Sequence, residues 1–224
     1  MIKNISNLGD AALYCDFGSE VNKEINSKVI QLFKNIKEKN IEGITNMTPS
    51  YNKLIVSFDL KITNFINLKK NIENLEIKKF AKTKSDVIKI PICCDKIFAL
   101  DIKNLEKKLK ISEDKILEKF FSKNYYCYMT GFIAGHTFLG DTDVSLRAKR
   151  LETPRVKIPK GSVGITEQFC NIYTFESPGG WNIIGNTPID VFDKTNENKP
   201  NLINPGDTVV FDQISKEEYE KYNH

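Results

Sequence analysis

Arginine is scarce in this chain, and all of it lies in one short segment. The 224 residues include 30 lysines but only three arginines: Arg147, Arg150 and Arg155. Lysine suffices for solubility, whereas the planar guanidinium of arginine presents a fork of donors that fits a carboxylate or a phosphate. The clustering therefore predicts an anion-binding segment. The alternative is a set of structural ion pairs with the nearby carboxylates of Asp141, Asp143 or Glu152.

A glycine-rich stretch, GFIAGHTFLGD, runs from Gly131 to Asp141 just ahead of the arginines. Its three glycines, mixed with Phe132 and Phe138, allow the backbone to come close to a ligand. His136 is the only histidine besides the terminal His224, and a histidine here can serve as a general base or as a ligand. A polar surface group is the alternative. The stretch is not a P-loop, because the Gly-Lys-Ser/Thr ending is absent.

A second irregular stretch, ESPGGWNIIGNTP, occupies Glu176 to Pro188. Glu176 stands beside Ser177 and a Pro-Gly-Gly turn. A carboxylate held at such a turn can bind a metal, orient water or accept a hydrogen bond from a ligand amide. Trp181, the only tryptophan, belongs either to this site or to the core of a barrel. A nucleophilic serine is not indicated, because Gly-x-Ser-x-Gly is absent.

Hydrophobic periodicity divides the first ninety residues into six elements. They are two helices, at 19–40 and 66–80, and four strands, at 10–18, 41–50, 53–60 and 85–93. Ser19 can cap the first helix. The order β-α-β-β-α-β predicts a ferredoxin-like domain over residues 1–90, with two helices on one face of an antiparallel sheet. This fold hosts many unrelated activities, so it predicts no function by itself.

The sequence changes character after Asn124. Two amphipathic helical pieces, 100–112 and 113–123, come before it, and Ser112 is placed to cap the second. Beyond it, eight of the twelve glycines fall between Gly131 and Gly185 and interrupt short strands. After the run YYCYMTGF, strands are expected at 155–158, 162–167, 169–175, 181–185 and 207–211. Short strands at this spacing predict a closed or nearly closed β-barrel over residues 91–224, and an α+β fold class for the chain.

Composition narrows the classes of function. The net charge of +4 comes from lysines interleaved with glutamates, whereas nucleic-acid binders concentrate their basic residues on one face or tail. The five cysteines include no C-x-x-C pair, so buried thiols are expected, with no metal ligated by the chain. Apolar runs fall short of the roughly 20 residues that span a membrane, and MIKNISNLGD resembles no signal peptide. A cytoplasmic location is expected.

Three segments in this order resemble one family. GFIAGHTFLG, TPRVKIPKGSVGI and ESPGGWNIIGNTP, with NPGD downstream, are similar to the KipI-type family, which includes the B-type subunit of the bacterial 5-oxoprolinase. The resemblance implies a cyclophilin-like barrel after the ferredoxin-like domain. It also implies two partner proteins, one of the KipA type and one of the LamB/YcsF type. Together such proteins open the lactam of 5-oxo-L-proline to L-glutamate, using ATP with Mg at the level of the complex.

The resemblance also implies site residues. Thr153, Pro154 and Arg155 match the family's second segment, which favours anion binding by Arg155. The residues expected to act in catalysis are His136, Arg155 and Glu176. Those expected to contact a ligand are Gly131, Phe132, Gly135, Phe138, Gly140, Ser177, Pro178, Gly179, Gly180 and Trp181. The family's loop usually reads GF-x-PGFPYLGGLD, and this chain departs from it at Ala134, His136, Thr137, Phe138, Asp141 and Thr142, so an altered substrate is an open alternative.

Two other functions remain open at this level. A relative in the same family inhibits autophosphorylation of a sensor histidine kinase, so a regulatory protein that docks on a histidine kinase is the main alternative. Related domains also occur in a biotin-dependent urea carboxylase. A carboxyltransferase-like module would need a biotinylated partner, and this chain contains no biotin-acceptor sequence.

Overall fold

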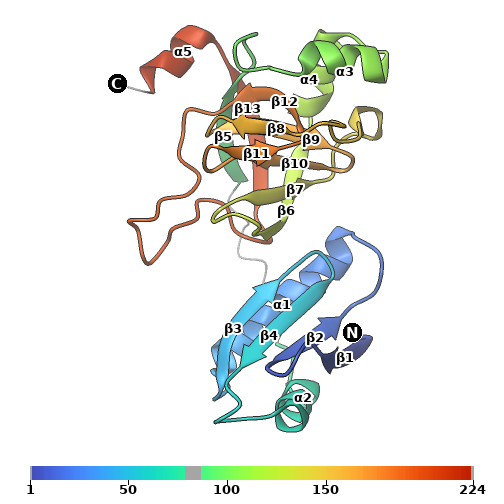
Figure 1. The fold of residues 1–224 in the computed structure, drawn as a ribbon, viewed down its shortest axis with the longest axis vertical. Helices are drawn as coiled ribbons and strands as arrows, with labels where there is room; N and C mark the ends of the chain where they lie inside the picture. The colour runs from blue at the N-terminus through green and yellow to red at the C-terminus, as the bar shows by residue number, and fades with distance from the viewer. Residues whose placement is uncertain (1, 79–86, 223–224) are drawn as a thin grey trace. The chain divides into compact units, whose positions relative to one another are not determined.

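The computed structural model describes residues 2–78 and 87–222 of the chain. It divides into two compact units, Met1–Lys84 and Ser85–His224, and each contains a hydrophobic core of its own (Figure 1). The helix predicted at 66–80 ends earlier, at Glu73. Residues 79 and 80 of that prediction and the first two residues of the strand predicted at 85–93 lie outside the described residues. The domain boundary predicted after residue 90 falls within a strand of the second unit, Val87–Cys93.

The first unit is an antiparallel sheet in the order β1-β2-β4-β3. Its strands are β1 (Asn4–Asn7), β2 (Ala12–Asp16), β3 (Ile44–Pro49) and β4 (Lys53–Phe58). Alternate residues of β2 and β4 are buried, among them Leu13 and Leu54. They share one core with apolar residues of α1 (Lys23–Lys39) and α2 (Phe65–Glu73), such as Leu32 and Leu68.

One strand of this sheet differs from the sequence prediction. The strand predicted at 85–93 forms β5 (Val87–Cys93), which pairs with strands of the second unit and so does not complete the first sheet. The remaining place beside β2 is taken by β1, whose polar sequence NISN shows no strand alternation. Pairing of β2 with β1, just upstream, closes only a short loop and costs little chain entropy. The β1–β2 hairpin is therefore favoured over pairing of β2 with the distant β5.

Polar side chains mark where the helices begin. Asn22 Oδ1 accepts a hydrogen bond from the Ile25 amide at 2.9 Å, so α1 begins at Lys23 and the predicted cap at Ser19 is wrong. The predicted cap at Ser112 is confirmed, since its hydroxyl accepts from the Lys115 amide at 3.4 Å at the start of α4 (Glu113–Phe121).

The second unit is built on a closed barrel with the strand order β10-β7-β6-β13-β5-β12-β9 (Figure 1). Besides β5, the strands are β6 (Asn124–Thr130), β7 (Thr137–Gly140), β9 (Ser162–Thr166), β10 (Phe169–Ile172), β12 (Asn182–Asn186) and β13 (Thr208–Ile214). The barrel predicted from short strands is therefore confirmed. β7 is an addition, because its residues belong to the predicted glycine-rich loop.

Further elements surround the barrel. Helix α3 (Ile102–Leu109) contacts β12, α4 contacts β13, and the last helix, α5 (Lys216–Lys221), contacts β5. A single 3-10 turn, η1 (Val144–Leu146), follows β7. Strands β8 (Arg155–Ile158) and β11 (Ser177–Gly179) form a separate two-stranded ribbon. Within the described part of the chain, no helix has both the length and the apolar character needed to cross a membrane.

Candidate functional site

The two-stranded ribbon joins two of the three segments singled out by sequence. Ser177 pairs with Ile158, and Gly179 pairs with Arg155, in antiparallel register. The first two residues of the predicted Pro-Gly-Gly turn therefore belong to a strand, in which Pro178 is exposed between its neighbours. The ribbon places Arg155 directly opposite Gly179.

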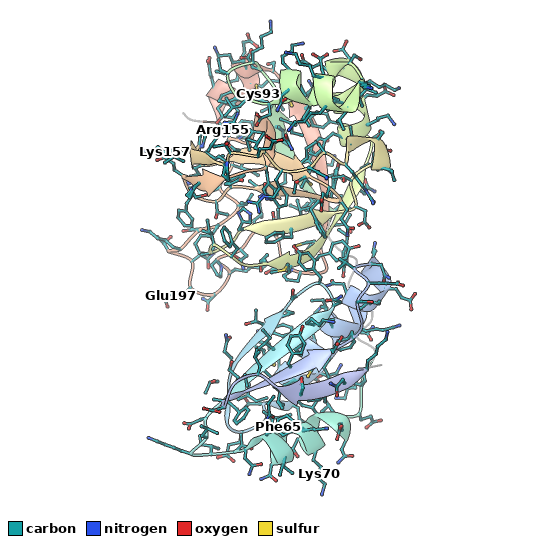
Figure 2. The ribbon with its side chains drawn as sticks, turned by 45° about the vertical axis from the view of Figure 1, so that its right-hand side comes forward. Phe65, Lys70, Cys93, Arg155, Lys157 and Glu197 are labelled. Carbon is teal, nitrogen blue, oxygen red and sulfur yellow. The ribbon has the colours of Figure 1, made fainter. Side chains whose placement is uncertain are left out.

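Arg155 is held by a buried carboxylate. Its Nη1 and Nη2 donate to the two oxygens of Asp101 at 2.8 and 2.7 Å, and Figure 2 labels this arginine on the barrel unit. The Asp101 side chain is 4 % exposed and its Oδ2 also accepts from the Ile183 amide at 2.7 Å. The structure thus contains the ion pair that was the alternative to anion binding, but its partner is Asp101 and not one of the nearby carboxylates.

Glu176 lies on the outside of the ribbon. Its carboxylate accepts from Lys157 Nζ at 2.9 Å, and both side chains are more than half exposed. This hydrogen bond raises the pKa of the Lys157 ammonium. Figure 2 shows Lys157 at the surface of the barrel unit. An exposed pair of this kind contributes little to stability, and among the described residues it does not connect Glu176 to His136 or Arg155.

His136 is buried, which contradicts the alternative of a surface group. The residue is 4 % exposed, and its Nε2 lies 2.7 Å from Asn171 Nδ2. Because an amide nitrogen donates, Nε2 accepts and the ring proton belongs on Nδ1. Nδ1 is buried and has no partner among the described residues. Burial lowers the pKa of His136 to about 4, so the imidazole is neutral at pH 7.

Aromatic rings surround His136. The centroids of Phe138 and Tyr173 lie 5.4 and 5.3 Å from the imidazole, and that of Phe132 lies at 6.1 Å, all in edge contacts. Phe138 also contacts Trp181 at 5.9 Å. The first and third segments therefore meet in one cluster. Trp181 is 9 % exposed, which agrees with a place in the packed barrel wall.

The glycines of these segments serve close packing. A side chain at Gly179 would overlap the Tyr173 hydroxyl, and one at Gly135 would overlap the Phe192 ring. Gly140 lies against Tyr128 and Gly131 lies near Met129. At Gly180, by contrast, a Cβ would make only ordinary contacts at 3.5 Å and beyond, and its carbonyl accepts from Leu151 N at 2.7 Å. Most of these glycines are thus explained by neighbouring side chains.

Two of the predicted ligand contacts, Phe132 and Ser177, have features that the packing of the barrel unit does not explain. Phe132 is 86 % exposed and has a φ of 72°, a left-handed backbone that a non-glycine residue adopts at an energetic cost. The Ser177 hydroxyl is buried and has no hydrogen-bond partner among the described residues. Unused polar groups and strained positions of this kind gather at functional sites more often than elsewhere.

The structure brings together the three segments but not the three predicted catalytic side chains. No hydrogen bond or ion pair of the described residues joins any two of His136, Arg155 and Glu176. Tyr173 links two of the segments, because its ring contacts His136 and its hydroxyl lies against Gly179. Burial raises the pKa of Tyr173, and the charges of Arg150 and Arg155 oppose this shift in part.

Sequence reasoning missed the partners of the predicted residues. Asp101, Asn171 and Tyr173 were not proposed. A polar residue inside a strand of apolar residues was the available signal for Asn171, which is fully buried in β10. Asp101 gave no such signal, because it precedes an amphipathic helix like any exposed N-cap residue.

A surface cleft borders the Arg155–Asp101 pair. Its volume is about 510 Å³, and we call it the α3 cleft. It is lined by Asp101, Asn104, Lys108, Leu151, Glu152, Thr153 and Arg155. Within residues 2–78 and 87–222, no group of three or more His, Cys, Asp or Glu side chains is arranged to hold a metal ion.

Comparisons with known proteins place the chain in a family. The protein named as the B-type subunit of 5-oxoprolinase in Bacillus subtilis is 31 % identical over 230 residues, which cover 97 % of this chain and 95 % of the relative. The protein of the same name from Haemophilus influenzae is 30 % identical, over 93 % of this chain and 96 % of the relative.

A solved structure carries the same fold. The crystal structure of TTHA0988 superposes with a TM-score of 0.84 at 26 % identity, over 92 % of this chain. This chain spans 41 % of the TTHA0988 chain, which is therefore considerably longer. Residues 3–203 match the family described as carboxyltransferase domain, subdomain C and D. The chain belongs to this carboxyltransferase-domain family, in which it resembles the proteins named as the B-type subunit of 5-oxoprolinase.

Proposed function

We propose that the chain is the B-type subunit of a 5-oxoprolinase that opens the lactam of 5-oxo-L-proline to L-glutamate with the use of ATP. One observation carries the proposal: 31 % identity to a protein of that name along nearly the full length of both chains. A similarity that covers both units supports a shared role better than a match to the barrel alone would. The chain acts as a component of a hydrolase complex and is inactive alone.

Finer features follow from the same proposal. The protein is of the KipI type, and its barrel is cyclophilin-like. The first unit is ferredoxin-like, which is supported by β2, α1 and β3 with β4 inserted between the two strands of the sheet. The partners in the complex are one protein of the KipA type and one of the LamB/YcsF type.

The chemistry explains why ATP and several proteins are needed. A lactam resists water, and transfer of a phosphoryl group to its oxygen creates a leaving group. We assign ATP and Mg to the level of the complex, where the phosphates of the nucleotide supply most of the ligands of the metal. Residues of this chain bind and orient: Arg155 is fixed by Asp101, and His136 is a neutral group within an aromatic cluster.

Reconstitution tests the proposal. The chain is co-expressed with its KipA-type and LamB/YcsF-type partners, and release of ADP and glutamate that depends on 5-oxo-L-proline is measured. Turnover that disappears when this chain is omitted supports the proposal. A stable complex that never turns over 5-oxo-L-proline contradicts it, as does carboxyl transfer to a biotinylated partner by the same complex.

A further inference from the structure

In the α3 cleft, the guanidinium of Arg155 is held in one orientation by the buried carboxylate of Asp101. Arg155 donates one N–H from each terminal nitrogen to Asp101, which is itself anchored by the Ile183 amide. A guanidinium has five N–H groups, so three remain for another acceptor. The Arg155 side chain is 31 % exposed and lines the cleft. A donor held in place before binding loses little entropy when an anion arrives.

Helix α3 supplies a second cation to the same cleft. Lys108 lies one turn after Asn104 on this helix, and both side chains line the cleft. Lys108 takes part in no ion pair among the described residues, so its ammonium group is available to a ligand in the cleft. Asn104 and Thr153 add an amide and a hydroxyl that make no hydrogen bond within the described residues.

The balance of charge selects the class of ligand. Two cations, Arg155 and Lys108, face two carboxylates, those of Asp101 and Glu152, so the formal charge of the lining is zero. Because the lining carries no net positive charge, it cannot balance the several negative charges of a triphosphate. A single carboxylate can engage Arg155 and Lys108, and a neighbouring amide or ammonium N–H on the same ligand can donate to Glu152.

We propose that the α3 cleft binds a small amino-acid-like carboxylate, with Arg155 and Lys108 as donors to the carboxylate and Glu152 as acceptor for its nitrogen. If the proposed function holds, the ligand is 5-oxo-L-proline or its product L-glutamate, and this identification rests on that function. The cleft volume of about 510 Å³ accommodates a ligand of this size.

Binding to the full chain tests the site directly. Amide chemical shifts are followed by NMR while 5-oxo-L-proline, L-glutamate or magnesium ATP is added to the wild type, to Lys108→Gln and to Lys107→Gln. Lys107 is the matched control, because it is exposed on the same helix and does not line the cleft. We expect saturable shifts along 101–108 and 151–155 with a carboxylate ligand, and a Kd about tenfold weaker in Lys108→Gln only. Equal binding by both variants, shifts elsewhere, or preference for magnesium ATP would overturn the proposal.

The reconstituted complex separates this inference from the proposed function. Lys108→Gln should raise the KM for 5-oxo-L-proline about tenfold with little change in kcat, whereas Lys107→Gln should leave both unchanged. Turnover with identical KM values in the two variants would contradict the carboxylate site and leave the function standing. Carboxylate binding at the cleft without turnover in any complex would support the carboxylate site and contradict the proposed function.

Discussion

His136 is a neutral imidazole inside the protein, and this gives stability a dependence on pH. Its pKa is about 4 in the folded state because of burial, compared with about 6.5 in an unfolded chain. As the pH falls from 6.5 toward 4, His136 is protonated in the unfolded state but stays neutral in the folded state. The free energy of unfolding should therefore fall by up to about 3 kcal/mol over this window, and the stabilisation should be complete above pH 6.5.

The variant His136→Gln isolates this contribution. Glutamine does not titrate and its carbonyl oxygen can still accept from Asn171. Urea unfolding of both proteins from pH 7 to pH 4 should show the steeper loss of stability in the wild type, because acidic groups are common to both. Parallel curves for the two proteins would show that the pKa of His136 is the same in the folded and the unfolded state.

The pair of Arg155 and Asp101 should matter more for stability than either of the other arginines. Arg155→Lys loses the two-pronged contact and leaves the buried Asp101 carboxylate poorly satisfied, which we expect to lower the free energy of unfolding by about 2 kcal/mol. Arg150→Lys is the control, since Arg150 is exposed and forms no ion pair within the described residues. Chemical denaturation checks both. Equal stability of the two variants would show that the pair is dispensable.

Sequence indicated the right residue types here but not their partners. The scarcity of arginine drew attention to Arg155, and the expected partners were carboxylates close in sequence. The actual partner is 54 residues upstream. Contacts of that separation depend on how the barrel and α3 come together, which local pattern does not encode. His136 similarly stands in a loop-like sequence, and its burial results from β10 and Tyr173 lying beside it.

At the scale of elements, Gly179 should tolerate no side chain whereas its neighbour Gly180 should. Gly179→Ala places a methyl group against the Tyr173 hydroxyl and an Ile158 methyl at 2.7 Å. We expect this overpacking to cost about 1–3 kcal/mol and to loosen the β8–β11 ribbon. Gly180→Ala meets its first neighbour at 3.5 Å and should be nearly neutral. Thermal unfolding of the two variants gives the comparison, and a Gly180→Ala protein as unstable as Gly179→Ala would contradict this account.

The sequence predicts where most strands lie better than it predicts which strands pair with one another. Alternating and β-branched residues indicated β8, β9, β10, β12 and β13 close to their observed bounds. β7 and β11 were missed because glycine and proline are typical of loops, and here those residues allow close packing. β5 was recognised as a strand but assigned to the wrong sheet, because a run such as VIKIPIC is suited to any buried strand.

At the scale of the whole molecule, the place of β5 predicts where the chain can be divided. A fragment of residues 85–224 retains all of β5, which pairs with β13 from Val87 to Cys93. A fragment of residues 91–224 lacks the first four residues of that strand, including the fully buried Ile90. We expect the longer fragment to fold cooperatively and the shorter one to be destabilised by several kcal/mol. Circular dichroism during thermal unfolding distinguishes them, and equal stability would move the boundary to residue 90.

The parallel pairing of β5 with β13 also has a consequence for biosynthesis. Val87 pairs with Thr208, and Cys93 pairs with Ile214, so the first strand of the second unit is completed by one of its last. On the ribosome, β5 emerges long before β13 has been translated. Until β13 is available, the apolar residues of β5 lack this pairing partner and stay exposed. The first unit draws all its described strands from the first 58 residues, and can fold while the barrel is still being made. We therefore expect chaperone dependence during synthesis to arise from the barrel.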